Sequence, residues 1–219
     1  MWSSEVTNMI ITGIWETLYM TLVSTLVGYV IGLPMGIILT VSDKDGIKPN
    51  AVLYKILDVI ANIVRSVPFI ILLVLLIPFT RLVVGKSYGS TATIVPLVIA
   101  AAPYIARMVE SSLKEVDAGV IEAARSMGAS NFTIITKVML VEARTSLLVG
   151  ATITLGTILG YSAMSGAVGG GGLGAIAIRY GYTRWQTDIM VVTVVLLVIL
   201  FQIFQTIGMK IANRLDRRK

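Results

Sequence analysis

Long apolar stretches alternate with short charged segments along the whole chain. Five of these stretches are long enough to be membrane spans, at about 17–42, 59–80, 87–107, 145–165 and 189–209. Each approaches or exceeds the roughly 20 residues that a helix needs to cross the hydrocarbon core of a bilayer. The pattern predicts an all-α integral membrane protein in which residues 1–219 form one domain with five transmembrane helices.

The basic residues between the spans predict how the chain is oriented. An odd number of spans places the termini on opposite sides, and cytoplasmic segments carry an excess of lysine and arginine. With the N-terminus outside, the outer segments hold four basic residues: Arg81, Lys86, Arg179 and Arg184. The inner segments hold the other fourteen: Lys44, Lys48, Lys55, Arg65, Arg107, Lys114, Arg125, Lys137, Arg144, Lys210, Arg214, Arg217, Arg218 and Lys219. The sequence therefore predicts an outside N-terminus and a cytoplasmic C-terminus.

Composition excludes several classes of chemistry. The chain is 56% hydrophobic and 14% charged, whereas soluble domains carry about 25% charged residues. It has no cysteine and no histidine, which removes thiol nucleophiles, thiolate metal sites and the commonest general base. We expect no cofactor or metal in this chain. The net charge of +6 follows from membrane topology, so no nucleic-acid partner is expected.

The segment between the third and fourth spans, about 108–144, is too long for a tight turn. Within it Val120, Ala123, Ala124 and Met127 recur at helical spacing and predict one apolar face. One interpretation is a connector lying on the membrane surface. The other is a protruding helix that docks into a groove of a partner protein. The two small alanines favour close approach to a protein.

Capping residues set the predicted ends of this short helix. Asp117 can cap its start, and Gly128 can adopt the left-handed conformation that ends it. Ser130 can then cap a second helix that leads back toward the membrane. We expect a helix, a glycine turn and another helix, none of them long enough to cross lipid.

This segment resembles the EAA motif of ABC-importer permeases. The resemblance rests on Glu122-Ala123-Ala124-Arg125-Ser126-Met127-Gly128-Ala129-Ser130, followed by Ile134, Ile135 and Leu140. At Val141 the chain departs from the proline that the family commonly carries. The resemblance implies a cytoplasmic coupling helix that inserts into an ATP-binding subunit through Val120, Glu122, Ala123, Ala124, Arg125, Met127, Gly128 and Ala129.

Other segments are similar to the methionine-importer branch of that family. They are Arg65-Ser66-Val67-Pro68-Phe69, residues 102–107, residues 166–174 and residues 178–182. The resemblance implies a type I ABC-importer permease fold, a multi-pass location in a bacterial plasma (inner) membrane and methionine as substrate. It also implies a homodimer in contact with lipid, two cytoplasmic subunits that bind ATP and Mg²⁺, and an extracytoplasmic substrate-binding lipoprotein.

The same resemblance and the position of the fourth span suggest a gate near Met164 and Ser165. Arg65 is the one basic residue inside a span, where it either has a function or extends its charge to the interface. Together with Ser66 and Pro68 it is a candidate for the transport pathway. Prolines within spans fit either ordinary helix ends or kinked helices around a pathway.

Glycines form two further patterns. Gly28, Gly32 and Gly36 recur every fourth residue, which predicts a flat helix face for close packing. The run at residues 169–174 matches GxGxxG, but it lacks the preceding strand of a dinucleotide site, so we expect flexible or tight backbone geometry near the outer mouth instead.

Three alternatives to a methionine permease stay open. A permease for another small solute would share every coupling feature. An ion channel would explain the spans and prolines but not the EAA-like segment. An intramembrane enzyme would have neither histidine, cysteine nor paired carboxylates within the spans to use.

Overall fold

The computed structural model describes residues 4–215, and every regular element among them is helical. The all-α prediction is confirmed. The basic residues Arg217, Arg218 and Lys219 of the charge count lie outside the described residues, as do residues 1–3. In chain order the elements are α1 (Ser4–Ser42), α2 (Ala51–Ser66), α3 (Phe69–Leu75), α4 (Ile77–Val84), α5 (Ser90–Lys114), α6 (Ala118–Ser126), α7 (Asn131–Thr133), the π-helical η1 (Ile134–Met139), α8 (Leu140–Glu142), α9 (Arg144–Ser165), the 3₁₀ turn η2 (Gly166–Val168), α10 (Gly172–Ile176), the π-helical η3 (Ala177–Tyr182) and α11 (Thr187–Leu215).

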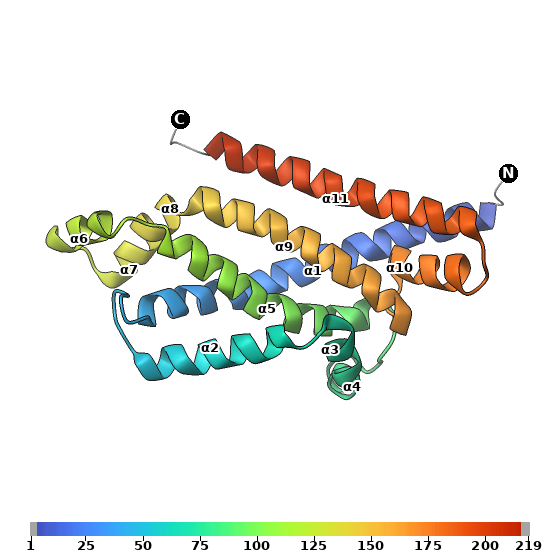
Figure 1. Ribbon diagram of the computed structural model, residues 1–219, viewed down its shortest axis with the longest axis horizontal. Helices are drawn as coiled ribbons and strands as arrows, with labels where there is room; N and C mark the ends of the chain where they lie inside the picture. Colours follow the sequence, from blue (N-terminus) through green and yellow to red (C-terminus); the bar gives the residue numbers. More distant parts are fainter. Residues whose placement is uncertain (1–3, 216–219) are drawn as a thin grey trace.

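Four or five candidate membrane spans account for these helices. Four helices are long and apolar enough to span a membrane, and the bent pair α2 and α3 adds a fifth if it is one span. In Figure 1 the long helices run along the molecule, with α6 and α7 at one end and α10 at the other. The N-terminus lies at the α10 end and the C-terminus at the α6 end. The termini are therefore at opposite ends, and which end faces the cytoplasm stays a prediction.

The first span begins at Ser4 rather than near Thr17. The sequence argument ended the span at the charge of Glu16, but that carboxylate accepts a hydrogen bond from the Gly172 N–H at 2.7 Å. The next residue, Thr17, accepts one from the Leu173 N–H at 2.9 Å. A glutamate with a backbone partner from another element can remain inside a helix, so the charge does not mark its end.

The second span is broken, not continuous from 59 to 80. Its helix axis bends by 101° between α2 and α3. Val67 is extended at φ −83° and ψ 125°, the conformation that a following proline favours, and Pro68 precedes α3. Pro78 lies in the first turn of α4, whereas the third span keeps Pro96 inside its helix. The prolines thus include both interior positions and helix ends.

The third span runs from Ser90 to Lys114, beyond the predicted limit at 107. The segment between the third and fourth spans is correspondingly shorter, residues 115–143, which we call the elbow. The fourth span begins at Arg144, one residue before the prediction, and ends at Ser165 as predicted. The fifth span extends past both predicted ends, from Thr187 to Leu215.

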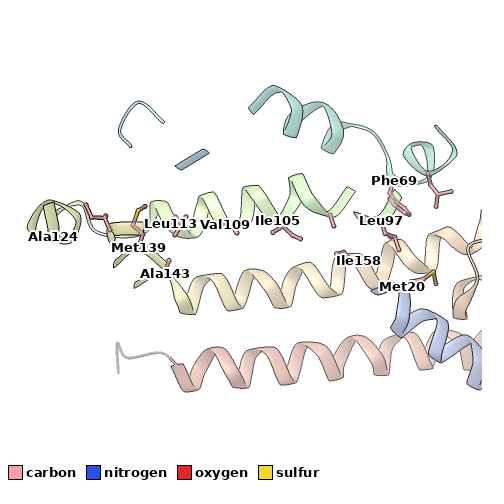
Figure 2. Close-up of a cluster of buried hydrophobic side chains, with 13 residues drawn as sticks. Met20, Phe69, Leu97, Ile105, Val109, Leu113, Ala124, Met139, Ala143 and Ile158 are labelled. Atoms are coloured by element: carbon pink, nitrogen blue, oxygen red, sulfur yellow. The ribbon is translucent and has the colours of Figure 1, made fainter. Parts of the chain in front are cut away.

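Close contact between α1 and α5 depends on glycine, as predicted. A Cβ atom on Gly32 would lie 2.6 Å from the Ala102 carbonyl oxygen, and one on Gly36 would lie 2.6 Å from the Ala106 carbonyl oxygen. Such distances are too short for any side chain, so the two backbones can meet only at glycine. Ile105 of α5 lines this contact and belongs, with Ile158 of α9, to one buried apolar cluster (Figure 2).

Candidate coupling surface and transport pathway

The elbow has the local structure that its capping residues predict. The Asp117 carboxylate accepts a hydrogen bond from the Gly119 N–H at 2.8 Å at the start of α6. Gly128 follows the helix with φ +79°, a left-handed conformation that side-chain-bearing residues rarely adopt. Ser130 caps α7 by accepting from the Thr133 N–H at 3.2 Å. The predicted helix, glycine turn and second helix are confirmed.

The apolar residues predicted for one face of α6 do not share one environment: some pack against their own chain and others are exposed. Ala124 is only 6% exposed and belongs to the buried cluster, together with the half-buried Ile121 and Ala129. Val120 is 42% exposed and Met127 is 82% exposed. The grouping of all four apolar residues on one outward face is therefore wrong for Ala124, because the elbow uses that side of α6 to pack against its own chain.

A loop from the other side of the bundle supports α6. The Arg125 guanidinium donates a hydrogen bond to the Ile47 carbonyl oxygen, in the α1–α2 loop, at 3.0 Å. Between this loop, the end of α5 and α6 lies a cavity of about 510 Å³, whose lining includes Asp45 and Glu122. Ala123 and Glu122 are exposed, and Ala123 is not part of the cavity lining. The outward surface of α6 is thus held by contacts on its inner side.

A chain of paired charges around the buried Glu110, not foreseen from the sequence, joins α2, α5 and the α1–α2 loop. Arg107 forms ion pairs with Asp58 and, at 2.7 Å, with Glu110. Lys114 pairs with Glu110 at 2.8 Å and with Asp43 at 2.7 Å. Each of these charges has a partner of opposite sign, which compensates the cost of removing it from water.

The network also affects Asp43 and Tyr54, which lie at its edges. The Lys114 ammonium, which donates a hydrogen bond to Asp43, holds the pKa of that carboxyl below its usual value. The Tyr54 hydroxyl donates to the Glu110 carboxylate at 3.3 Å. The spacing of Arg107, Glu110 and Lys114 on successive helical turns was a sequence signal for such a network. Only the fold shows that Asp58 and Asp43 complete it.

The three pathway candidates from the second span lie together at its break. Arg65 and Ser66 end α2, Pro68 begins α3, and all three are exposed in the single chain. Arg65 lies over the ring of Tyr104 in α5, 6.0 Å from the ring centre. Asn62, one turn earlier, is also exposed. These residues form a polar surface on a helix whose Ile56, Val59, Ile60 and Ile63 form a separate exposed apolar surface.

The length of α2 decides how deep Arg65 lies. Arg65 follows Ala51 by fourteen residues, about 21 Å along the helix at 1.5 Å per residue. The hydrocarbon core is about 30 Å thick, and α2 runs along the bundle from the elbow end toward its middle (Figure 1). The Arg65 backbone therefore lies nearer the middle of the bundle than the start of α2. Whether its charge has a function or extends to the interface stays a prediction.

The gate candidates on α9 have different environments. Met164 is 52% exposed, on the same helix face as Gly160 and Ile153. Ser165 is fully buried, and its hydroxyl donates to the Ser162 carbonyl oxygen at 2.6 Å. Its own carbonyl accepts from the Gly170 N–H at 2.9 Å. The structure does not bring Met164 and Ser165 onto one surface of the chain, and their role in a gate stays a prediction.

The glycine run after α9 forms a tight junction. Gly169, Gly171 and Gly172 have φ values of +83°, +87° and +73°. A Cβ atom on Gly174 would lie 2.1 Å from the Ala163 carbonyl oxygen, so α10 returns directly against α9. The predicted tight backbone geometry is confirmed.

Comparison with known proteins identifies the family. The family of binding-protein-dependent transport system inner membrane components matches residues 28–219. The chain belongs to this family and is an inner membrane transport component.

Relatives extend the similarity to the whole chain. It is 49% identical over 99% of its length to the probable D-methionine transport system permease protein MetI of Vibrio cholerae, of which 96% is covered. It is 44% identical over the full length of both chains to the methionine import system permease protein MetP of Bacillus subtilis.

Solved structures show the same fold. An inward-facing structure of the MetNI methionine ABC transporter matches with a TM-score of 0.97 and 51% identity, covering 99% of this chain and 100% of that one. An amino acid ABC transporter crystallised with histidines matches with a TM-score of 0.79 at 21% identity, covering 96% of this chain and 95% of that one. The chain therefore has the fold of a type I ABC-importer permease, as predicted.

Proposed function

We propose that this chain is the permease subunit of an ATP-driven importer of methionine. Two copies enclose the pathway, two ATP-binding subunits attach at the elbow end, and an extracytoplasmic binding lipoprotein delivers substrate at the α10 end. Membership in a binding-protein-dependent transport family supports this arrangement. So do the methionine transport proteins among its relatives.

The observation that carries the coupling role is the outward surface of α6. Met127 and Val120 are exposed apolar residues at the end of the molecule, next to the exposed Ala123. An apolar helix face of this kind fits a groove in a partner. Glu122 and Arg125 border this face. Ala124 and Ala129 pack on the inner side of the elbow, and Gly128 forms its turn.

Rigid contacts explain how a movement of α6 would reach the spans. Ala124 packs in the buried cluster, and Arg125 is bonded to the α1–α2 loop. The elbow is also continuous with α5 and α9 on either side. When the ATP-binding subunits close, α6 moves with them and the spans follow. Coupling requires that these subunits bind the inward-facing and outward-facing states with different affinities.

The chain itself is a transport subunit. ATP and Mg²⁺ are bound by the partner, which supplies hydrolysis. In the alternating-access cycle, Arg65, Ser66 and Pro68 line the inner half of the pathway, and Met164 and Ser165 contribute to its gate. Access from one side at a time follows if the two copies rock against each other around this region.

Reconstitution tests the proposed function. Proteoliposomes are prepared with this chain, its ATP-binding subunit and its binding protein, and uptake of labelled L-methionine and D-methionine is measured with and without ATP. We expect accumulation only with ATP and binding protein. Flux without nucleotide would identify a channel instead, and accumulation of another solute in preference to methionine would identify a different permease.

Orientation has its own test. The chain contains no cysteine, so a single Ala123→Cys substitution gives one reactive thiol. Because Ala123 is exposed in the single chain, an impermeant maleimide should label it in inverted membrane vesicles prepared without the ATP-binding subunit, but not in intact cells. Labelling in intact cells would place the elbow outside and contradict ATPase coupling.

A further inference from the structure

We propose that Arg65 binds the carboxylate of the transported amino acid within the membrane-spanning part of the pathway. The inference rests on the proposed function, because it requires an amino acid as cargo. It assigns to one side chain the recognition of the charged group that every free amino acid carries.

The first argument is that the charge of Arg65 is uncompensated. Arg107 and Lys114 on the facing helix each have two carboxylate partners. Arg65 forms no ion pair or hydrogen bond with any residue from 4 to 215, and its one recorded contact is with the Tyr104 ring. Asp58, two turns earlier on α2, is already paired with Arg107. The Arg65 guanidinium, at the end of α2, therefore has no anion beside it among residues 4–215.

The second argument is energetic. A charged side chain in the middle of a span costs several kcal/mol unless it is paired or faces water, and residues that are kept there usually serve a substrate or ion pathway. Arg65 lies about 21 Å from the start of α2, at its end near the middle of the bundle. An incoming carboxylate would supply the missing charge.

The third argument is geometry. Arg65 shares its helix face with Asn62, away from the apolar face of Val59 and Ile63 that suits lipid. The Tyr104 ring supports the guanidinium by a cation–π contact, which leaves the donor edges of the guanidinium available. A guanidinium offers parallel N–H donors that match a carboxylate in a bidentate pair. A lysine would offer the charge without this match.

An aromatic pair follows the break after Ser66. Four residues beyond Arg65, Phe69 stacks on Tyr161 of α9 with ring centres 4.5 Å apart and planes within 5°. Phe69 is buried and Tyr161 is half-buried, so the pair holds the start of α3 against α9.

Protection of a neighbouring thiol tests the site without requiring transport. Ser66→Cys introduces the sole thiol of the chain beside Arg65, and a small maleimide labels it in the purified transporter. Methionine is titrated as the probe, with methioninamide as the analogue that lacks the carboxylate. At about ten times its dissociation constant a ligand leaves about a tenth of sites free, so labelling should slow about tenfold with methionine. Methioninamide should slow it much less.

Matched variants separate carboxylate binding from a structural effect. Arg65→Gln in the Ser66→Cys background should abolish protection by methionine, whereas Arg65→Lys should keep a weakened part of it. Lys55→Gln removes an exposed cation from the same helix and should leave protection unchanged. Gel filtration of each variant checks its fold.

Three results would overturn the site: no protection by methionine, equal protection by methionine and methioninamide, or undiminished protection in Arg65→Gln. Uptake by the unsubstituted transporter tests the proposed function separately. If that transporter imports methionine and the thiol is not protected, the function stands and the site is wrong. If it imports no amino acid, the proposed function is wrong, and the Arg65 site, which requires an amino acid as cargo, is wrong with it.

Discussion

Met127 is the most informative residue at which to test coupling. Its side chain is 82% exposed, so it contributes almost nothing to the stability of its own chain. Transferring an exposed methionine side chain into an apolar groove contributes about 1.5–3 kcal/mol. Because about 1.4 kcal/mol corresponds to a tenfold change in affinity, Met127→Ala should weaken binding of the ATP-binding subunit by about 10- to 100-fold per site.

The assay is titration of the purified ATP-binding subunit onto the immobilised permease in detergent, followed by ATP-driven uptake with the same variant. Tyr182→Ala is a matched control, because Tyr182 is also strongly exposed but lies at the opposite end of the molecule. The thermal unfolding temperature should be unchanged for Met127→Ala. An unaltered dissociation constant would show that the outward surface of α6 is not where the partner binds.

Ala124 would be a poor choice for this experiment. It is 6% exposed and packed against its own chain, so Ala124→Glu would bury a carboxylate without a partner. Loss of transport in that variant would report damage to the elbow and not loss of a docking contact. The distinction depends on the direction in which α6 faces, which the helical spacing of the sequence did not reveal.

Three further predictions concern packing, backbone conformation and charge. Gly32→Ala should destabilise the fold by about 1–3 kcal/mol in detergent melts, because its Cβ would collide with α5, whereas Gly150→Ala, whose Cβ would be 3.6 Å from its nearest neighbour, should not. Replacing Gly128, at φ +79°, by valine should reduce ATP-driven uptake because the turn is strained by about 1–2 kcal/mol, while Gly128→Asn should retain it; equal uptake in both would contradict the turn's role. The pKa of Asp43 is lowered by Lys114, so its stabilising effect is present above the pKa of an unfolded aspartate, about 3.9, and is lost as pH falls toward the lower folded value. The difference in unfolding temperature between the natural chain and Asp43→Asn should therefore shrink on acidification, and a constant difference would exclude this linkage.

The sequence was most reliable where one local rule decided the structure. A bilayer requires a long run of apolar residues, so hydropathy located the long helices, although not all of their ends. Gly128 needs a left-handed conformation that few other residues adopt, so the end of α6 was readable from one position. The elbow and its caps are short-range features, and a single chain segment contains all the information that forms them.

Local rules failed where residues distant in the chain changed the free-energy cost of keeping a charge inside a helix or of bending the chain. Glu16 lies inside α1 because the Gly172 N–H of another element satisfies it. Glu110 lies inside α5 because Arg107 and Lys114 of the same helix and Tyr54 of α2 satisfy it. The burial of Ala124 follows from contact with its own fold, which helical spacing alone does not specify.

The sequence by itself determined that the chain is an all-helical membrane protein with a helical elbow, because both depend on the order of apolar, charged and glycine residues along the chain. The tertiary structure decided which charges are compensated and which are not. Pairing depends on three-dimensional distance: Arg107 lies within reach of Asp58, 49 residues earlier in the chain, whereas Arg65 on the same helix as Asp58 has no anion beside it.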